Sequence, residues 1–440
     1  MLMGLKRALV LTYYWPPSGG AGVQRWLKFV KYLREYGYEP VVYTAANGEM
    51  PVYDPTLAND IPEGVEEIRT EIWEPYHLYK KMVGGNSKEK INTGFLSESG
   101  NPKFTQKLGV WIRGNFFIPD ARCFWIKPSV KYLTQYLKDH PVDVIISTGP
   151  PHTMHMIALG LKRKLGTPWV ADFRDPWTNI DFYKDLMLTK LADWRHHSME
   201  RRVVRNADYV VTVTKQDRDD YLRMGAKRAV TITNGYDEDD FKQDGITLDE
   251  LFTLSHIGTI PPSRNPESLW KAMSLLVKKN EDFARDFQLK LVGKVDVSVR
   301  QMIAKYGLDA NVNFIDYLPH AEAVKQQLQS RALLLLVNNT PNAKGILTGK
   351  FFEYLATGRP VVAIGPTDGE VAAVLRSTGA GSCSDFGDAD TLAQSIEVLY
   401  RQFKEQGDCR NASSGASQFS RRNLTAQMAK VLDEVVGCRL

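Results

Sequence analysis

Cysteine is scarce and scattered in this chain of 440 residues. The four cysteines form no C-x-x-C pair and lie at Cys123, Cys383, Cys409 and Cys438. This spacing argues against a zinc ribbon, a dithiol redox pair and a disulfide scaffold, and it fits a reducing cytoplasm.

Long apolar runs are also missing from the sequence. No stretch approaches the roughly 18 to 20 apolar residues that a membrane-spanning helix needs. The N-terminal stretch MLMGLKRALVLTYYWPP has a short apolar run that Thr12, Tyr13 and Tyr14 end, with no small-residue cleavage site. We therefore expect a first strand there and not a signal peptide.

Charge of neither sign dominates, because 56 basic residues against 51 acidic residues leave a net charge of +5. This mild excess gives no support to a nucleic-acid partner, and it suits anionic small molecules or an anionic membrane surface. With 43% hydrophobic and 24% charged residues the chain is globular. Its length is too great for one ordinary core, so we expect two domains.

Strand-like and helix-like stretches alternate along nearly the whole chain. Most strand candidates are continuously apolar, as expected for parallel strands that helices cover on both faces. The pattern predicts an α/β fold with two doubly wound, Rossmann-like domains. The expected strands are residues 7–13, 40–44, 142–148, 168–173, 208–214, 229–233, 252–257, 289–293, 311–315, 332–337 and 360–364.

The clearest domain boundary is NGYDEDDFKQDGITLDE, residues 234–250, which is rich in Asp and Gly. It separates an expected N-terminal domain, residues 1–240, from a C-terminal domain, residues 251–417. Residues 418–440 have apolar residues at the spacing of an amphipathic helix.

The first expected strand runs into a glycine-bearing turn. Gly19, Gly20 and Gly22 precede a helix at the carboxyl end of a strand, where open α/β sheets bind ligands and helix amides favour anions. The turn lacks the G-x-G-x-x-G spacing of a dinucleotide fingerprint. Such turns also occur for backbone reasons alone, so both interpretations stay open.

A second glycine-bearing turn is TGKFFEYLATGRP, residues 348–360, which predicts a short helix capped by Thr348. Lys350 and Glu353 stand one turn apart at its start. A P-loop is excluded, because a phenylalanine replaces the Mg-binding hydroxyl residue and the glycine spacing is one residue short. The spacing leaves two alternatives, a solvent-exposed ion pair and a site for an anionic ligand.

The order of these motifs closely resembles that of family 4 glycosyltransferases of the GT-B fold, in a bacterial surface-polysaccharide branch. HIGTIPPSRNPESL, NVNFIDYLPHAE and TGKFFEYLATGRPVVA followed by GEVAAVL resemble the family's glycine loop, base-binding turn and donor site. YYWPPSGGAGVQRWLKFVKYL, PWVADFRDPW, and ADYVVTVTKQ with ITNGYDEDDF resemble its N-terminal domain. The resemblance covers residues 7–435. It implies two domains that face each other across a cleft, with the last helix crossing back to the first domain.

The resemblance implies roles for individual residues. Glu353 would accept the ribose hydroxyls of a nucleoside diphosphate sugar, and Lys350 and Arg264 would hold the diphosphate and stabilise it as it leaves. The expected catalytic residues are Arg264, Lys350 and Asp175. The expected donor-binding residues are Gly19, Gly20, Gly258, Asp316, Tyr317, Leu318, Thr348, Gly349 and Glu353.

The implied function is transfer of a sugar from a nucleotide-sugar to a glycan or lipid-linked acceptor, with retention, in cell-surface polysaccharide or lipopolysaccharide synthesis. The sequence departs from the family at Gly345, where many members have a first glutamate eight positions before the second. This departure leaves the sugar and the stereochemical outcome open. Two alternatives remain, a sugar-nucleotide 2-epimerase on the same fold and a catalytically idle nucleotide-binding subunit.

Other polar residues follow expected strand ends. Asp175 in DFRDPW is either a substrate-binding residue or part of a structural ion pair. His152 and His155 have the spacing of metal ligands, but no third ligand is evident in the sequence, and enzymes of the GT-B fold generally need no bound metal. We expect no metal site and no cofactor.

Residues 80–131 contain ten basic residues against three acidic ones, with aromatic residues interleaved. They form either an insertion with solvated lysines or a patch for a lipid acceptor and an anionic membrane surface. The patch would place the enzyme in the cytoplasm, peripherally at the inner face of the plasma membrane. Its residues are Lys103, Lys107, Trp111, Arg113 and Arg122.

Overall fold

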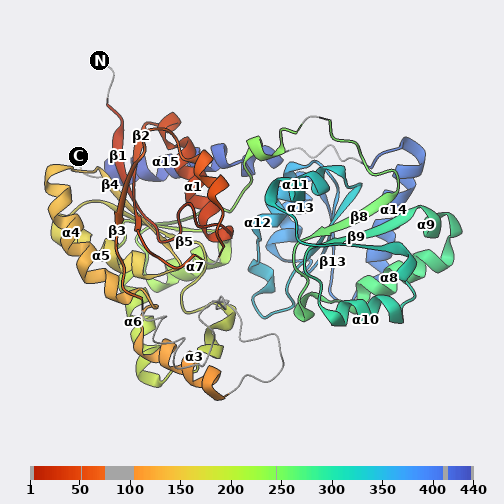
Figure 1. Cartoon of the computed structure of the whole chain (residues 1–440), viewed down its shortest axis with the longest axis horizontal. Coiled ribbons are helices and arrows are strands. Elements are labelled where there is room, and N and C mark those ends of the chain that lie inside the picture. Colours follow the sequence, from red (N-terminus) through yellow and green to blue (C-terminus); the bar gives the residue numbers. More distant parts are fainter. Residues whose placement is uncertain (1–3, 51, 75–103, 244, 410–414, 438–440) are drawn as a thin grey trace. The chain divides into compact units, whose positions relative to one another are not determined.

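The computed structural model describes residues 4–50, 52–74, 104–243, 245–409 and 415–437. The chain divides into two compact units. The first unit consists of Met1–Thr233 with Leu424–Leu440, and the second of Asn234–Asn423. Each unit contains one parallel β-sheet flanked by helices (Figure 1). The α/β fold with two doubly wound domains is confirmed.

The first unit has a seven-stranded sheet in the order β3-β2-β1-β4-β5-β6-β7. Its strands are β1 (Lys6–Leu11), β2 (Tyr38–Ala45), β3 (Glu66–Thr70), β4 (Val144–Gly149), β5 (Trp169–Phe173), β6 (Tyr209–Thr212) and β7 (Ala229–Thr231). Its helices are α1 (Ala21–Leu33), α3 (Phe104–Phe116), α4 (Ile126–Asp139), α5 (Thr153–Leu165), α6 (Lys190–Asn206) and α7 (Lys215–Met224), together with most of α15 (Arg421–Gly437).

Both faces of this sheet are buried, which explains its continuously apolar strands. In β1, Leu9 and Leu11 belong to one core cluster, while Ala8 and Val10 belong to the other. Helix α15 packs into the second of these clusters, where Met428 and other apolar side chains of the helix join residues of α1 and β1. The end of the chain is therefore part of the first unit.

The second unit has a six-stranded sheet in the order β10-β9-β8-β11-β12-β13. Its strands are β8 (Phe252–Ile257), β9 (Phe287–Val292), β10 (Val312–Ile315), β11 (Ala332–Leu336), β12 (Val361–Ile364) and β13 (Gly381–Ser384). Its helices are α8 (Glu267–Lys279), α9 (Glu281–Asp286), α10 (Val297–Lys305), α11 (His320–Gln329), α12 (Gly349–Ala356), α13 (Glu370–Thr378) and α14 (Ala389–Gln406). The reversal of strand order between β8 and β11 is the kind of position at which open α/β sheets bind ligands.

All eleven strands expected from the sequence are present, and two further strands were not predicted. These are β3 and β13, and each lies at an edge of its sheet. In β3 only Ile68 is buried, and β13 is the small polar sequence GSCS. An edge strand pairs on one side only and can be polar, so it lacks the apolar run by which the others were found.

Candidate functional site

Lys350 lies near the start of α12, at the carboxyl end of the second sheet. Its ammonium Nζ is 3.3 Å from Nε2 of His256, the penultimate residue of β8. Gly258 makes this position possible, because a Cβ there would collide with the Lys350 ammonium. Burial and the nearby Arg264 lower the pKa of Lys350 to about 7, against the opposing effect of Glu353. Lys350 is partly buried and its ammonium contacts His256, so it does not form a solvent-exposed ion pair with Glu353 among the described residues.

Arg264 brings a second positive charge to the same place. It ends a short 3-10 turn, Pro262–Arg264, that follows β8. Its Nε donates a hydrogen bond to the side-chain oxygen of Asn338, which lies just beyond β11. Burial lowers the pKa of the guanidinium, yet an arginine stays charged at neutral pH. Two cations close enough to interact, with no carboxylate of the described residues bound between them, form a site that favours an anion.

Glu353 lies one turn beyond Lys350 on α12. Its Oε2 accepts a hydrogen bond of 3.0 Å from Nε2 of Gln327 on α11. Gln327 is buried, so its hydrogen bond holds the Glu353 carboxylate from the side of the protein interior. A carboxylate has about four acceptor positions, and this bond uses one of them. The others can accept hydroxyl groups of a ligand.

The first turn of α12 brings the N-terminus of a helix to this site. Thr348 is the N-cap residue, but its side chain makes no capping hydrogen bond, so the predicted side-chain cap is wrong. Its buried hydroxyl oxygen has no hydrogen-bond partner among the described residues. A Cβ at Gly349 would meet no atom within 4 Å, so the space before the helix is open. The N-terminus of a helix with free amides attracts anions.

The predicted base-binding turn follows β10 at the same edge of the sheet. Tyr317 is 80% exposed and Asp316 is exposed, whereas Leu318 packs on the core of the second unit. The second unit therefore brings together Arg264, Lys350, Glu353, Gly258, Thr348 and Gly349, with the turn beside them along the same edge.

Three residues of this site were not predicted from the sequence, namely His256, Asn338 and Gln327. Each contacts one of the charged side chains from a different element. His256 and Asn338 lie at the carboxyl ends of expected strands, and that position was a usable signal. Gln327 lies in the middle of an amphipathic helix, and nothing in the sequence distinguishes it.

Gly19, Gly20 and Asp175 belong to the first unit. Gly20 has a φ of 91° and precedes α1, and a Cβ at Gly19 would come within 2.8 Å of Asp54. The backbone of the turn therefore requires glycine at both positions, whatever it binds. Asp175 is exposed and interacts electrostatically with the neighbouring Arg174.

The residues before Asp175 have a structural role. Asp172 and Arg25 form a buried ion pair, with 2.8 Å between Asp172 Oδ1 and Arg25 Nη2. Asp172 also accepts hydrogen bonds from Trp26 and Thr148. Arg174 donates to main-chain oxygens of the first glycine turn and of the turn after β4.

His152 and His155 are packed among aromatic rings. The His152 ring stacks on Trp177 with 4.4 Å between centroids, and His155 Nδ1 lies 2.8 Å from the Ser147 hydroxyl. Burial lowers the pKa of both imidazoles. In the described residues there is no group of three or more His, Cys, Asp or Glu side chains that could hold a metal ion.

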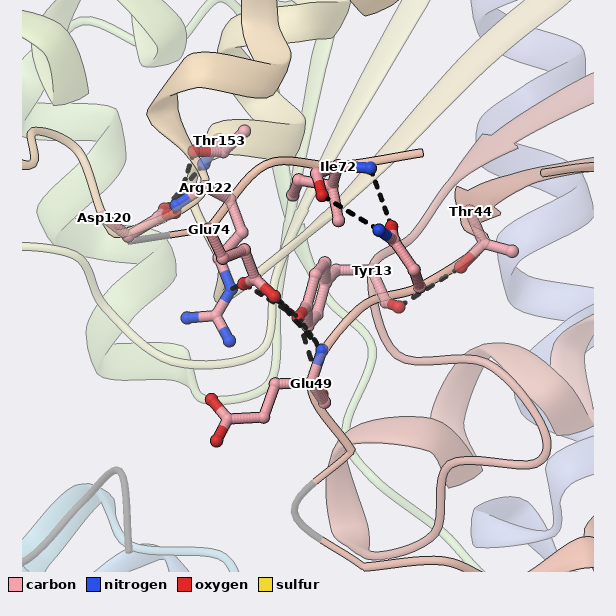
Figure 2. Close-up of polar contacts among 9 residues, drawn as sticks. Tyr13, Thr44, Glu49, Ile72, Glu74, Asp120, Arg122 and Thr153 are labelled. Carbon is pink, nitrogen blue, oxygen red and sulfur yellow. Dashed lines mark hydrogen bonds and ion pairs between the residues drawn. The ribbon is translucent and has the colours of Figure 1, made fainter. Parts of the chain in front are cut away.

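Arg122 is not part of a surface patch, which corrects the sequence-based prediction. Its side chain is buried, and Nε lies 2.9 Å from Oε1 of Glu74 (Figure 2). The Tyr13 hydroxyl donates to the same carboxylate, and the Arg122 guanidinium lies 4.4 Å from the Tyr13 ring centroid. A count of charges along the sequence treats every arginine as solvated, whereas the buried Glu74 neutralises this one.

Of the remaining patch residues, Lys107, Trp111 and Arg113 belong to α3. Lys103 lies outside the described residues, as does the side chain of Lys107. Trp111 is exposed and Arg113 is partly exposed. Asn115 on α3 bonds to the main chain of Met187 and Thr189, so α3 packs beside the start of α6. The apolar side chains exposed on α3, on α6 and just before α6 are Leu108, Trp111, Phe116, Met187, Leu191 and Trp194, and we call this set the apolar surface of α3 and α6.

Two models of protein families match the sequence. The model described as "Glycosyl transferase 4-like domain" matches residues 100–235, and "Glycosyl transferases group 1" matches residues 252–402. No curated protein has a significant sequence match. None of the helices in the described part of the chain combines the length and apolar character needed to cross a bilayer.

Several solved structures share the fold. A glycosyltransferase from Rickettsia africae ESF-5 is 14% identical, with a TM-score of 0.61 and 99% of each chain covered. WaaG, a glycosyltransferase involved in lipopolysaccharide biosynthesis, is 13% identical, with a TM-score of 0.53 and 97% of this chain and 99% of that chain covered. A putative UDP-N-acetylglucosamine 2-epimerase from Listeria monocytogenes is 11% identical, with a TM-score of 0.57 and 98% and 96% covered.

Proposed function

Because the chain is a family 4 glycosyltransferase of the GT-B fold, we propose that it transfers a sugar, with retention, from a nucleoside diphosphate sugar to a glycan or lipid-linked acceptor. The observation that carries this proposal is the grouping of Lys350, Arg264 and the open N-terminus of α12 beside Glu353. The cations suit a diphosphate, and the carboxylate suits ribose hydroxyls.

In this proposal the second unit binds the donor. Lys350, Arg264 and the amides after Thr348 contact the diphosphate, and Glu353 accepts hydrogen bonds from the ribose. The turn Asp316-Tyr317-Leu318 lies against the base.

Lys350 and Arg264 would act on the reaction through their charge. When the bond between the anomeric carbon and the diphosphate oxygen breaks, negative charge develops on that oxygen, while the acceptor oxygen bonds to the carbon and its proton passes to the departing diphosphate. Positive charge placed there before the reaction stabilises the transition state more than the ground state. We propose that these cations and the helix amides suffice and that no metal is required.

Gly345 bears on which sugar is transferred. It ends a 3-10 turn, Ala343–Gly345, where many family members have a carboxylate. Without that carboxylate, the sugar hydroxyls must find other partners, and a donor sugar of different hydroxyl pattern fits this change. The same absence is the reason for the alternative of a catalytically idle nucleotide-binding subunit. The matched family models, both of glycosyltransferases, favour transfer over epimerisation, although an epimerase shares the fold.

We further propose that the enzyme acts in the synthesis of cell-surface polysaccharide or lipopolysaccharide, in the cytoplasm and peripherally at the membrane. WaaG, which shares the fold, is described as acting in lipopolysaccharide biosynthesis. The apolar surface of α3 and α6 is accompanied by Arg113, Lys190 and Arg195 on the same helices. Exposed aromatic and basic side chains together suit the interface of an anionic bilayer.

A thermal-shift screen of UDP-, GDP-, ADP- and TDP-sugars tests the central proposal. A ligand at about 100 times its Kd stabilises the protein by roughly 2.7 kcal/mol, which shifts the melting temperature measurably. Product analysis of the best donor, with and without an acceptor, then separates transfer from epimerisation. If no sugar nucleotide stabilises the protein, the proposed donor site is wrong.

A further inference from the structure

Two bonds tie α12 to the end of β8, and one of them involves the buried His256. The main-chain N–H of Ile257 donates to the Tyr354 hydroxyl at 2.9 Å, and His256 Nε2 lies 3.3 Å from Lys350 Nζ. Lys350 and Tyr354 are four residues apart, so they lie on the same face of the helix. That face therefore meets β8 at two successive residues.

The other ring nitrogen of His256 defines its tautomer. Nδ1 lies 3.0 Å from the carbonyl oxygen of Leu334 in β11, and a carbonyl oxygen can only accept. Nδ1 must therefore carry the proton. In a neutral ring Nε2 then has a free lone pair, and it is this atom that faces the Lys350 ammonium.

The ring is held in the neutral form. Burial lowers the pKa of His256 well below its usual value, and the charges of Lys350 and Arg264 act in the same direction. The carbonyl groups of Leu334 and Thr259 oppose this shift and are outweighed. Within the described residues, the carboxylate that interacts with Lys350 is that of Glu353 on the same helix. A neutral acceptor can thus bind the ammonium and leave its charge intact. A carboxylate in the same place would cancel that charge.

We propose that His256 is a positioning residue for Lys350: its neutral imidazole accepts a hydrogen bond from the ammonium and holds it over Gly258, at the diphosphate site. This inference rests on the proposed function, in which Lys350 binds the diphosphate. The proposal assigns His256, the penultimate residue of β8, a role in aligning a charge, in addition to packing in the core. Small displacements of such a group reduce binding and rate strongly.

The experiment measures binding of UDP, GDP, ADP and TDP by calorimetry and uses whichever binds wild type. His256→Leu removes the acceptor and should weaken binding by about tenfold. His256→Gln, whose amide oxygen can accept, should recover affinity to within about threefold of wild type. In a Lys350→Met background, His256→Leu should cause no further loss. Ser255→Ala is the matched control, because Ser255 is buried in the same strand and bonds to Ser330 instead.

The outcomes separate the two proposals. If wild type binds none of the nucleotides, the proposed function fails. If wild type binds, Lys350→Met weakens binding and His256→Leu does not, the positioning role alone is wrong. Equal losses from His256→Leu in both backgrounds would also overturn it, because they would indicate a general structural effect. If His256→Leu does not fold, nitrogen-15 NMR of labelled histidine in wild type decides, since protonation of Nε2 instead of Nδ1 contradicts the role.

Discussion

Gln327 donates a hydrogen bond of 3.0 Å to Glu353, and this bond holds in place a carboxylate that interacts electrostatically with Lys350. Lys350, Arg264 and Glu353 each have a neutral partner from another element, respectively His256, Asn338 and Gln327. The charges of the site are thus oriented without being neutralised. An anionic ligand with hydroxyl groups meets all three in a defined arrangement.

Glu353→Gln should weaken binding of the nucleoside diphosphate sugar while leaving the fold intact. A hydrogen bond to a charged group contributes roughly 1.5–3 kcal/mol, so the loss of affinity should be about tenfold or more. Calorimetry measures it. Glu322→Gln is a suitable control, because Glu322 is an exposed carboxylate on α11. Equal affinities of wild type and Glu353→Gln would remove Glu353 from the donor site.

Binding should also depend on pH through Lys350. Its pKa is about 7 in the free protein, because burial and Arg264 disfavour the charged form. The ammonium that attracts the diphosphate is present below that value and is lost as the pH rises through it, so affinity should fall between about pH 6 and 8. A sugar nucleotide has no ionisation of its phosphates in this range, and binding should take up a proton.

Calorimetry in two buffers of different ionisation enthalpy detects this proton uptake. Lys350→Met should bind more weakly at pH 6 and should show no pH dependence over the same range. A wild-type affinity that stays constant from pH 6 to 8 would contradict the assignment of the titrating group.

Donor binding should not require magnesium. Lys350, Arg264 and the amides at the start of α12 already supply positive charge for the diphosphate. Affinities measured with EDTA and with added magnesium should agree within about twofold. Loss of binding in EDTA that magnesium restores would show that a metal ion takes part.

The sequence predicted the two charged residues of α12 and the strands around them, because these depend on local patterns. Helical spacing placed Lys350 and Glu353 one turn apart, and continuous apolar runs marked the buried strands. The partners His256, Asn338 and Gln327 come from distant segments, and a sequence pattern does not reveal which side chains meet. The polar edge strands β3 and β13 were not predicted, for a related reason. Their formation depends on pairing with the adjacent strand, and their own residues have no apolar run that indicates a strand.

Arg122 illustrates the opposite error, in which the charge count of residues 80–131 was taken to mean that each basic side chain is exposed. Residues 80–131 are basic in sum, but this arginine turns inward to Glu74 and Tyr13. Conversely, Leu191 and Trp194 on α6 lie outside that range and yet are exposed beside α3. A surface is assembled from separate segments, so its members could not be read from one stretch.

Asp172→Asn should destabilise the first unit strongly. The substitution keeps the size of the side chain but leaves the Arg25 charge without its partner, and both side chains are almost completely buried. Removing one member of a buried pair costs about 3–5 kcal/mol. Urea unfolding at neutral pH measures the loss. Glu434→Gln, which breaks the exposed pair with Arg228, should change the free energy of unfolding by less than about 1 kcal/mol.

Membrane attachment should depend on the apolar surface of α3 and α6. Trp111, Phe116 and Trp194 are exposed there, and nearby basic side chains each contribute about 1 kcal/mol at an anionic surface. The attraction falls off within a Debye length of about 8 Å at physiological salt, so binding to anionic vesicles should weaken as salt rises. Sedimentation with vesicles of anionic and of neutral lipids measures it. Changing the three aromatic residues to Ser should abolish binding, whereas Tyr53→Ser, at another exposed aromatic residue of the first unit, should not.

Arg122 supplies a second control that separates this surface from the charge count of residues 80–131. Its guanidinium is engaged with Glu74, so Arg122→Gln should lower stability without lowering the affinity of the folded protein for vesicles. Arg113→Gln and Arg195→Gln together should lower that affinity at low salt, because these side chains lie on α3 and α6 themselves. If instead the aromatic variant sediments like wild type, or binding is equal on neutral and anionic vesicles, this surface does not attach the enzyme to an anionic bilayer. The donor site in the second unit would be unaffected by that result, since its residues belong to a different sheet.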